Sequence, residues 1–191
     1  MSDIKQWKAS VRKQMLKRRA GLGKGYRVSA DQAILKRILG MESYRQANVL
    51  FTYVSMEGEV DTREVILRAL ADGKQVAVPR CGKGGIMSAH RIKSMEELRP
   101  GAFGILEPVE SCEETRPEDM EFVLVPCVCC CGSGVRLGYG GGYYDRFLPG
   151  TPAVRAALCW EKMMAEDIPR EKHDCAMDFV VTEERVIEYS R

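Results

Sequence analysis

The chain of 191 residues has the length of one large domain, and its 45% hydrophobic and 29% charged residues are typical of a folded globular protein rather than a disordered one. Its net charge of +2 is too small to indicate nucleic-acid binding by itself, and no apolar run is long enough to span a bilayer. Because residues 1–10 also lack the apolar segment of a signal peptide, we expect a cytoplasmic protein with a single α/β domain over residues 1–191 and no membrane partner.

The first predicted element is an amphipathic helix from residue 3 to about residue 20. Its apolar stripe would consist of Ile4, Trp7, Val11 and Met15. Between residues 5 and 27 the chain carries nine Lys or Arg residues and no Asp or Glu, so the opposite face of this helix is basic. A solvated face is the ordinary explanation of such a charge run, and an RNA-contacting surface is the alternative.

A second helix is predicted from Ser29 to Leu39, because Ser29 is a good N-cap and Gly40 a common terminator. Further helices are expected after Asp61 or Thr62, over residues 143–148 and over residues 162–166. Strands are predicted over residues 48–54, 75–79, 86–92, 121–126, 153–159 and 177–182, with residues 186–189 pairing near the last one.

The loop at residues 55–60 leaves the carboxyl end of the first strand, where open α/β sheets bind their ligands. Asp61 and Glu64 have a local role because they can cap the next helix, whereas Glu57 and Glu59 have none. A solvated acid is the commoner fate of any single loop glutamate. The residues alone therefore leave the role of Glu59 open.

Eight cysteines would suggest disulfides in a small secreted chain, but this chain is larger, and we expect reduced thiols. Cys127 and Cys130 form a CxxC pair, yet no second pair and no histidine pair stands at zinc-finger spacing. We interpret the cysteines that crowd the end of the strand as small buried apolar residues. These are Cys127, Cys129, Cys130 and Cys131.

Residues 134–148 combine a glycine cluster with charged and aromatic side chains, between the strand at 121–126 and the helix at 143–148. Gly140 to Gly142 can take positive φ and carry no Cβ, so their N–H groups can converge on an anion at a helix N-terminus. Arg136 adds a positive charge, and Asp145 is a hard oxygen ligand placed for a phosphate-bound Mg²⁺. The spacing fits neither a Walker loop nor a dinucleotide fingerprint. A flexible surface turn is the alternative.

The run RLGYGGGYYDRFL resembles the signature of the 5-formyltetrahydrofolate cyclo-ligase family, also called 5,10-methenyltetrahydrofolate synthetase. Other stretches agree with the family in order along the chain: the basic N-terminal helix, SMEGEVDT, VPR, GILEP and HDCAMD. The resemblance implies a Rossmann-like, CoA-transferase-like α/β fold with a mostly parallel sheet and helices on both faces. It also implies an ATP- and Mg²⁺-dependent enzyme that cyclises 5-formyltetrahydrofolate to 5,10-methenyltetrahydrofolate through a phosphorylated imidate.

The resemblance also assigns residues to the site. The implied ATP-binding residues are Lys8, Arg12, Arg136, Leu137, Gly138, Tyr139, Gly140, Gly141, Gly142, Tyr143 and Tyr144. The implied folate-binding residues are Val54, Met56, Glu59, Tyr139, Gly140, Gly141, Gly142 and Tyr143. Asp174 joins Asp145 as an expected Mg²⁺ ligand, and Arg136, Tyr143 and Lys8 are the expected catalytic residues.

The chain departs from the family pattern after the strand at 121–126, where the usual Gly and Ala-Phe-Asp-like segment are replaced by Cys127 and by Cys129 to Cys131. One alternative is therefore a family member that binds folate without turnover. The other is an RNA-binding module that uses the basic helix, although RNA readers interleave basic and aromatic residues over a surface. With ATP and a folate as its small-molecule partners, the protein is expected to be a monomer that binds no nucleic acid.

Overall fold

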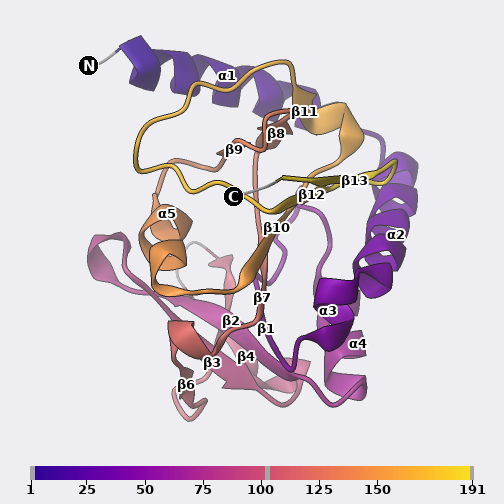
Figure 1. The fold of residues 1–191 in the computed structure, drawn as a ribbon, viewed down its shortest axis with the longest axis vertical. Helices are drawn as coiled ribbons and strands as arrows, with labels where there is room; N and C mark the ends of the chain where they lie inside the picture. The colour runs from indigo at the N-terminus through magenta and orange to yellow at the C-terminus, as the bar shows by residue number, and fades with distance from the viewer. Residues whose placement is uncertain (1–2, 102–103, 190–191) are drawn as a thin grey trace.

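The centre of the computed structural model, which describes residues 3–101 and 104–189, is an eight-stranded sheet (Figure 1). Its strands, in spatial order, are β13 (Val186–Glu188), β12 (Phe179–Val181), β10 (Val154–Leu158), β7 (Phe122–Val125), β1 (Val49–Thr52), β2 (Gln75–Cys81), β3 (Met87–Ile92) and β6 (Glu114–Thr115). From β12 to β2 all neighbours are parallel, and the outer strands β13, β3 and β6 pair antiparallel. The expected mostly parallel α/β sheet is confirmed.

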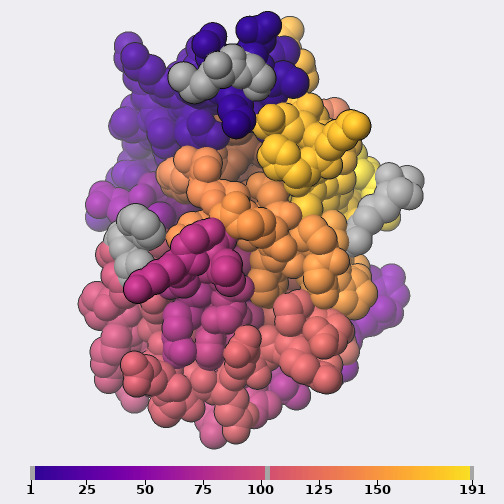
Figure 2. Space-filling model, turned by 90° about the vertical axis from the view of Figure 1, so that its left-hand side faces the viewer, coloured from indigo at the N-terminus to yellow at the C-terminus, as the bar shows by residue number. Residues whose placement is uncertain are grey.

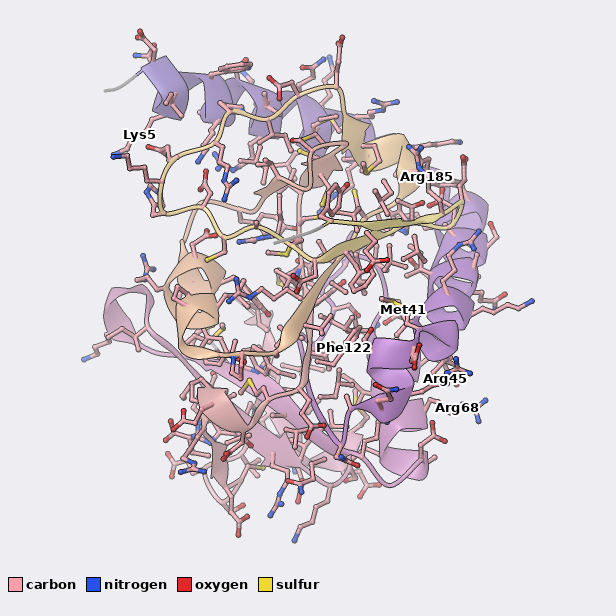
Figure 3. All side chains as sticks on the ribbon, viewed as in Figure 1. Lys5, Met41, Arg45, Arg68, Phe122 and Arg185 are labelled. Carbon is pink, nitrogen blue, oxygen red and sulfur yellow. The ribbon has the colours of Figure 1, made fainter. Side chains whose placement is uncertain are left out.

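The central strands are apolar on both faces because helices cover both sides of the sheet. Every residue of β7 is fully buried, and Figure 3 shows Phe122 in the interior, while Arg45 and Arg68 point outward from their helices. On one side lie α2 (Lys24–Gly40), α3 (Glu42–Gln46) and α4 (Arg63–Ala71), and on the other lies α5 (Tyr143–Phe147) (Figure 1).

Two smaller sheets flank the central one. One contains β11 (Met164–Ala165), β8 (Cys129–Cys131) and β9 (Arg136–Leu137), and the other pairs β4 (Leu98–Pro100) with β5 (Leu106–Pro108). Short 3-10 turns cover Lys83–Gly85, Met95–Glu97, Pro117–Asp119, Leu148–Gly150 and Glu161–Met163. No helix among the described residues combines the length and the apolar character needed to cross a membrane.

The predicted N-terminal helix is confirmed as α1 (Asp3–Ala20), but only Val11 and Met15 of its predicted apolar stripe pack against the core. Ile4 and Trp7 are 36% and 49% exposed, while Lys8 and Arg19 are buried with Met15. Lys8 and Arg19 turn inward because their charged side chains reach polar partners elsewhere in the fold, whereas other basic residues of α1, such as Lys13 and Lys17, stay exposed.

Three other expected elements differ. The second helix begins at Lys24, and the hydroxyl of Ser29 donates to backbone carbonyls inside it instead of capping it. The helix expected at 162–166 is a 3-10 turn followed by β11, because Met164 and Ala165 pair with β8. The antiparallel pair β8–β9 separates the central strand β7 from the glycine cluster, where the sequence predicted a direct strand–loop–helix connection.

Candidate active site

A cavity of about 990 Å³ opens at the carboxyl ends of β1, β2 and β7. Figure 2 shows this face, where indigo α1 lies beside golden residues from the last part of the chain and above the orange glycine cluster. All residues predicted for the ATP, folate and metal sites line the cavity, although they come from segments far apart in the chain. They are Lys8, Arg12, Val54, Met56, Glu59, Arg136, Leu137, Gly138, Tyr139, Gly140, Gly141, Gly142, Tyr143, Tyr144, Asp145 and Asp174. Their individual roles stay predictions.

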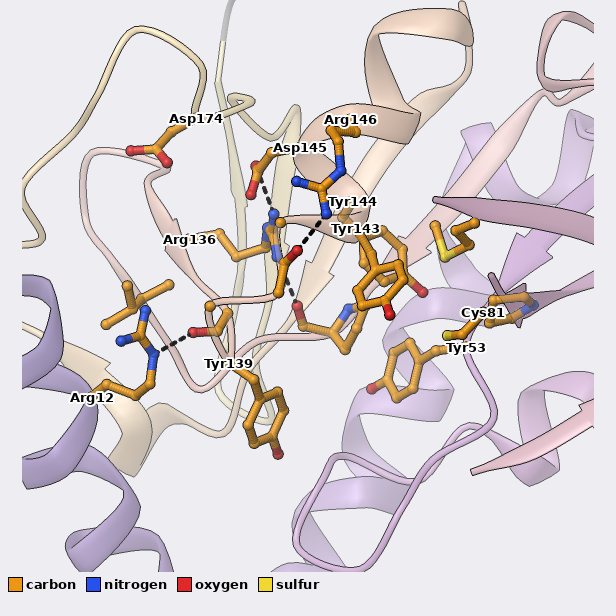
Figure 4. Close-up of a pocket in the computed structure, with 18 of the residues that line it drawn as sticks. Arg12, Tyr53, Cys81, Arg136, Tyr139, Tyr143, Tyr144, Asp145, Arg146 and Asp174 are labelled. Atoms are coloured by element: carbon orange, nitrogen blue, oxygen red, sulfur yellow. Dashed lines mark hydrogen bonds and ion pairs between the residues drawn. The ribbon is translucent and has the colours of Figure 1, made fainter. Parts of the chain in front are cut away.

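The glycine cluster is held against α1 and α5 by arginines. Of the three glycines, Gly140 and Gly142 have positive φ, at 101° and 67°, and Gly141 does not. Arg12 Nε donates to the Gly138 carbonyl at 2.8 Å (Figure 4). A Cβ on Gly140 would make only an ordinary contact with the Arg12 guanidinium, at 3.5 Å, so the positive φ of Gly140 is what favours glycine there.

Three ion pairs lie along the cavity wall. Lys8 Nζ lies 2.5 Å from Asp174 Oδ2 and 2.9 Å from Glu171 Oε2, and Arg136 lies 2.8 Å from Asp145 Oδ1. Burial opposes the charge of Lys8, but its hydrogen bonds to the two carboxylates raise the pKa of Lys8. Burial likewise opposes the charge of Asp174, yet the N–H of Glu171 and the Lys8 ammonium lower the pKa of Asp174. The site therefore holds charged groups of both signs at neutral pH.

The two predicted metal ligands differ in their neighbours. Asp145 also accepts from the backbone N–H of Cys175 at 3.2 Å. Asp174 lies in a group of possible ligands with Glu171 and His173, whose ligand atoms are all within 4.8 Å of one another. That group does not contain Asp145. The cavity thus has more oxygen ligands near Asp174 than the sequence predicted, since Glu171 was not among the candidates.

The carboxylate of Glu59 lines the cavity from the loop that follows β1. It is 9% exposed and accepts the backbone N–H of Met56 at 3.0 Å, beside Val54. Burial raises the pKa of Glu59, and the hydrogen bond from Met56 only partly offsets this effect. Glu57, two residues earlier, is exposed. A buried acceptor that already has one backbone donor is suited to bind N–H groups of a flat heterocycle.

The two adjacent tyrosines of the signature run make different contacts. Tyr144 packs against Phe51 of β1, with ring centroids 6.2 Å apart, and the Arg136 guanidinium lies 5.7 Å from its ring centre. Its buried hydroxyl has no hydrogen-bond partner among the described residues. Tyr143 lies farther out, with the Arg146 guanidinium 5.9 Å from its ring centre. Tyr144 is therefore part of the core as well as of the cavity wall.

Sequence reasoning missed Arg19, Arg146 and Glu171. Arg19 donates to the Tyr139 hydroxyl at 2.7 Å, and Arg146 donates to backbone carbonyls of Gly85 and Gly141. Extending the helical spacing of Lys8 and Arg12 along α1 would have pointed to Arg19, which lies seven positions beyond Arg12. No local pattern marks Glu171, whose partner Lys8 is 163 positions away.

The cysteines after β7 are buried as expected, with at most 5% exposure. The sequence did not show that Cys127 and Cys130 meet Cys159, which follows β10. Cys127 Sγ donates to the Leu158 carbonyl at 3.1 Å. These thiols lie behind the cavity wall, since Pro126 lines the cavity and Cys127 does not.

Comparisons with known proteins point to one family. Residues 4–183 match the model of the 5-formyltetrahydrofolate cyclo-ligase family. The 5-formyltetrahydrofolate cyclo-ligase of Saccharomyces cerevisiae is 33% identical over 177 residues, covering 79% of this chain and 81% of the yeast protein.

Solved structures agree with that match. The NMR structure of Aquifex aeolicus 5,10-methenyltetrahydrofolate synthetase has a TM-score of 0.84 at 31% identity and covers 95% of this chain and 92% of that one. A 5,10-methenyltetrahydrofolate synthetase from Mycoplasma pneumoniae, with a TM-score of 0.76 at 18% identity, covers 92% of this chain and 98% of its own. At that identity the Mycoplasma structure supports the fold alone.

Proposed function

The chain belongs to the 5-formyltetrahydrofolate cyclo-ligase family and carries out its folate cyclisation, and from this premise we propose that it converts 5-formyltetrahydrofolate to 5,10-methenyltetrahydrofolate with ATP and Mg²⁺. The observation that carries the proposal is the single cavity of about 990 Å³, lined by every residue that the family resemblance assigns to either substrate. That volume is large enough to hold two substrates in contact.

In the proposed reaction, the formyl oxygen attacks the γ-phosphorus of ATP and ADP leaves. The product of this step is a phosphorylated imidate, whose carbon is then attacked by N10 of the folate. Phosphate departs with the former formyl oxygen, so an otherwise poor leaving group has been replaced by a good one. Phosphoryl transfer of this kind depends on alignment and charge neutralisation more than on a strong base.

Before ATP binds, the positive charges that this reaction needs are held in ion pairs with carboxylates. Lys8 is paired with Asp174, and Arg136 with Asp145, all four side chains being 22% exposed or less. We infer an exchange of partners on ATP binding, in which phosphate oxygens take over Lys8 and Arg136 and release the two carboxylates. The cost of separating each pair is offset by equally charge-assisted contacts to the triphosphate.

The donor set also fits Mg²⁺. Asp145 and Asp174 offer hard oxygens on the cavity wall, and the lowered pKa of Asp174 keeps that carboxylate ionised. These two residues would hold the ion, which would supply charge neutralisation at the phosphates. Tyr143 and the backbone from Gly140 to Gly142 would position the phosphates and the folate beside one another.

On the folate side, Glu59 would accept N–H groups of the pterin ring, with Val54 and Met56 in contact with the ring faces. The buried Tyr144 hydroxyl supports a polar ligand nearby, because a buried hydroxyl without a partner is costly. A bound substrate oxygen or nitrogen would satisfy it.

The test is an absorbance assay for 5,10-methenyltetrahydrofolate formation by the purified chain, with and without ATP. We expect product only when ATP is present, and removal of divalent ions with EDTA should abolish turnover until Mg²⁺ is restored. ATP-independent product would contradict the phosphorylated imidate. Turnover that persists in EDTA would show that the reaction does not need a divalent metal ion.

Titrations separate the two alternatives if no product forms. Folate binding without turnover would identify a family member that has lost catalysis. RNA binding without folate binding would identify α1 as a nucleic-acid surface, whose exposed Lys13, Lys17 and Arg18 would contact the phosphates of an RNA backbone.

A further inference from the structure

Three buried thiols converge behind the wall of the cavity. Cys127 and Cys130 come from the segment after β7, and Cys159 follows β10, so their meeting depends on the tertiary fold. Their exposures are 5%, 0% and 2%, and the sulfur atoms all lie within 4.8 Å of one another. Burial as small apolar residues explains each cysteine singly but does not require three sulfurs to face a common point.

The sulfur atoms are close enough to share one metal ion, since they all lie within 4.8 Å of one another. Three sulfurs bound at about 2.3 Å from one ion lie about 4 Å from each other. In the part of the chain that the structure describes, no fourth His, Cys, Asp or Glu joins this group, so the tetrahedral set that structural zinc requires is incomplete. Three thiolates without a fourth ligand favour a soft ion of low coordination number.

We propose that Cys127, Cys130 and Cys159 form a three-sulfur binding site for a soft, thiophilic metal ion, with Cu(I) as the best-matched ion. The site is separate from the Mg²⁺ site, whose ligands are carboxylates, and sulfur and oxygen donors select different ions. It is independent of the folate reaction, so either proposal can fail without the other.

A small cavity of about 10 Å³ adjoins two of the three thiols, Cys127 and Cys159, and is also lined by Arg19 and Trp160. Cys130 does not line it, so the ion would lie between the three sulfurs and not in this cavity. Arg19, which donates to the Cys127 carbonyl at 2.7 Å, places positive charge near a set of thiolates that would otherwise be buried without compensation.

The test uses the reduced full-length protein under anaerobic conditions, titrated with Cu(I) against a colorimetric Cu(I) chelator. We expect one tightly held Cu(I) per chain and a rise in the thermal unfolding midpoint on loading. Cys159→Ser keeps a hydroxyl able to donate to the Trp160 carbonyl but removes a soft ligand, and it should lower the affinity by about 100-fold or more.

Cys129→Ser is the matched control, because Cys129 is buried in β8 directly before Cys130 but lies outside the three-thiol group. It should bind Cu(I) as the unmodified chain does. Equal affinity of Cys129→Ser and Cys159→Ser, or no stoichiometric Cu(I) binding by the unmodified chain, would overturn the proposal. If Cys159→Ser fails to fold, X-ray absorption on the Cu(I)-loaded unmodified chain decides: three sulfur neighbours support the site and two refute it.

Discussion

The two sides of the cavity are built by different kinds of contact. The proposed folate side consists of Val54, Met56 and Glu59, with Tyr53 beside them, and the proposed phosphate side consists of Lys8, Arg12, Arg136, Asp145 and Asp174. On the folate side, hydrogen bonds join near neighbours, such as Met56 to Glu59 and Tyr53 to Val60. On the phosphate side, Lys8 and Asp174 are 166 positions apart.

This difference implies different responses to substitution. The folate side continues from a buried strand, so its shape follows from the sheet and its own loop. The phosphate side depends on opposite charges that hold separate segments together, and removing one partner leaves the other buried without compensation. Substitutions on the phosphate side should therefore have the larger effects, on catalysis first and on substrate binding second.

The largest effect is expected for Asp145→Asn. The change removes the negative charge opposite Arg136, whose side chain is 5% exposed, and removes a proposed Mg²⁺ ligand. We expect kcat to fall by about 10²–10³-fold, the range seen when one electrostatic group of an active site is removed. The measurement is kcat at saturating ATP, folate and Mg²⁺, with circular dichroism to check the fold.

Asp119→Asn is the matched control for that experiment. Asp119 pairs with Arg116 at 2.7 Å, the same chemistry as the pair in the cavity, but the two side chains are 45% and 70% exposed. Exposed pairs contribute little, so activity and stability should remain unchanged. Full turnover by Asp145→Asn at saturating Mg²⁺ would remove Asp145 from the reaction.

A smaller effect is expected for Lys8→Gln. Loss of a charge-assisted contact to phosphate should raise the KM for ATP by about tenfold to a hundredfold, while the KM for folate changes little. Steady-state kinetics with each substrate varied in turn gives both constants. Lys13→Gln, on the exposed face of the same helix, should leave both unchanged. If only the KM for folate changed, Lys8 would contact folate and not ATP, which would contradict the proposal.

The fold was largely predictable because its central strands are continuous apolar runs. Phe122–Val125 is such a run, and it forms β7. Short strands were missed where pairing, not hydrophobicity, decides the structure: Met164 and Ala165 adopt a strand because they meet β8 across the fold. The residues around Met164 and Ala165 in the sequence give no indication that they pair with β8.

The candidate site was predictable where one continuous motif carries it and unpredictable where distant charges meet. The glycine cluster and Asp145 belong to one signature. The family resemblance pointed to Lys8, but helix periodicity did not show that Lys8 or Arg19 turns inward, because a helix pattern reveals an apolar face and not a polar partner more than a hundred residues away. Arg19 and Glu171 were missed for the same reason.

On the folate side, Glu59→Gln should raise the KM for folate by about tenfold, as expected for one lost charge-assisted hydrogen bond. Because burial raises the pKa of Glu59, the unmodified carboxylate is protonated at a higher pH than an ordinary glutamate. The KM for folate should therefore rise as the pH falls through that raised pKa, and Glu59→Gln should lose this pH dependence. The exposed Glu57→Gln is the control and should retain it.

Glu59 should also make the stability of the folded protein depend on pH. This dependence is opposite to that of folate binding, because low pH favours folding but weakens the binding of folate. A raised pKa in the folded state means that folding favours the protonated form, so the stability that Glu59 contributes is present at low pH and is lost as the pH rises through the raised value. Denaturant unfolding of the unmodified chain and of Glu59→Gln across this range measures it. Identical slopes for the two proteins would show that Glu59 has an ordinary pKa.

The smallest effect is expected for Arg19→Lys, at the junction of the two sides. Arg19 donates to the Tyr139 hydroxyl and to the carbonyls of Cys127 and Val128, all within 2.8 Å. Its Cδ also lies 3.7 Å from the point that a Cβ on Gly58 would occupy, in the loop at residues 55–60. A lysine ammonium cannot reproduce the planar fork, so Tyr139 should lose its orientation. Since neither substrate is proposed to contact Arg19, both KM values should rise together, by about threefold to tenfold, with kcat nearly unchanged. A rise in only one KM would show that Arg19 belongs to one side of the cavity and does not couple the two.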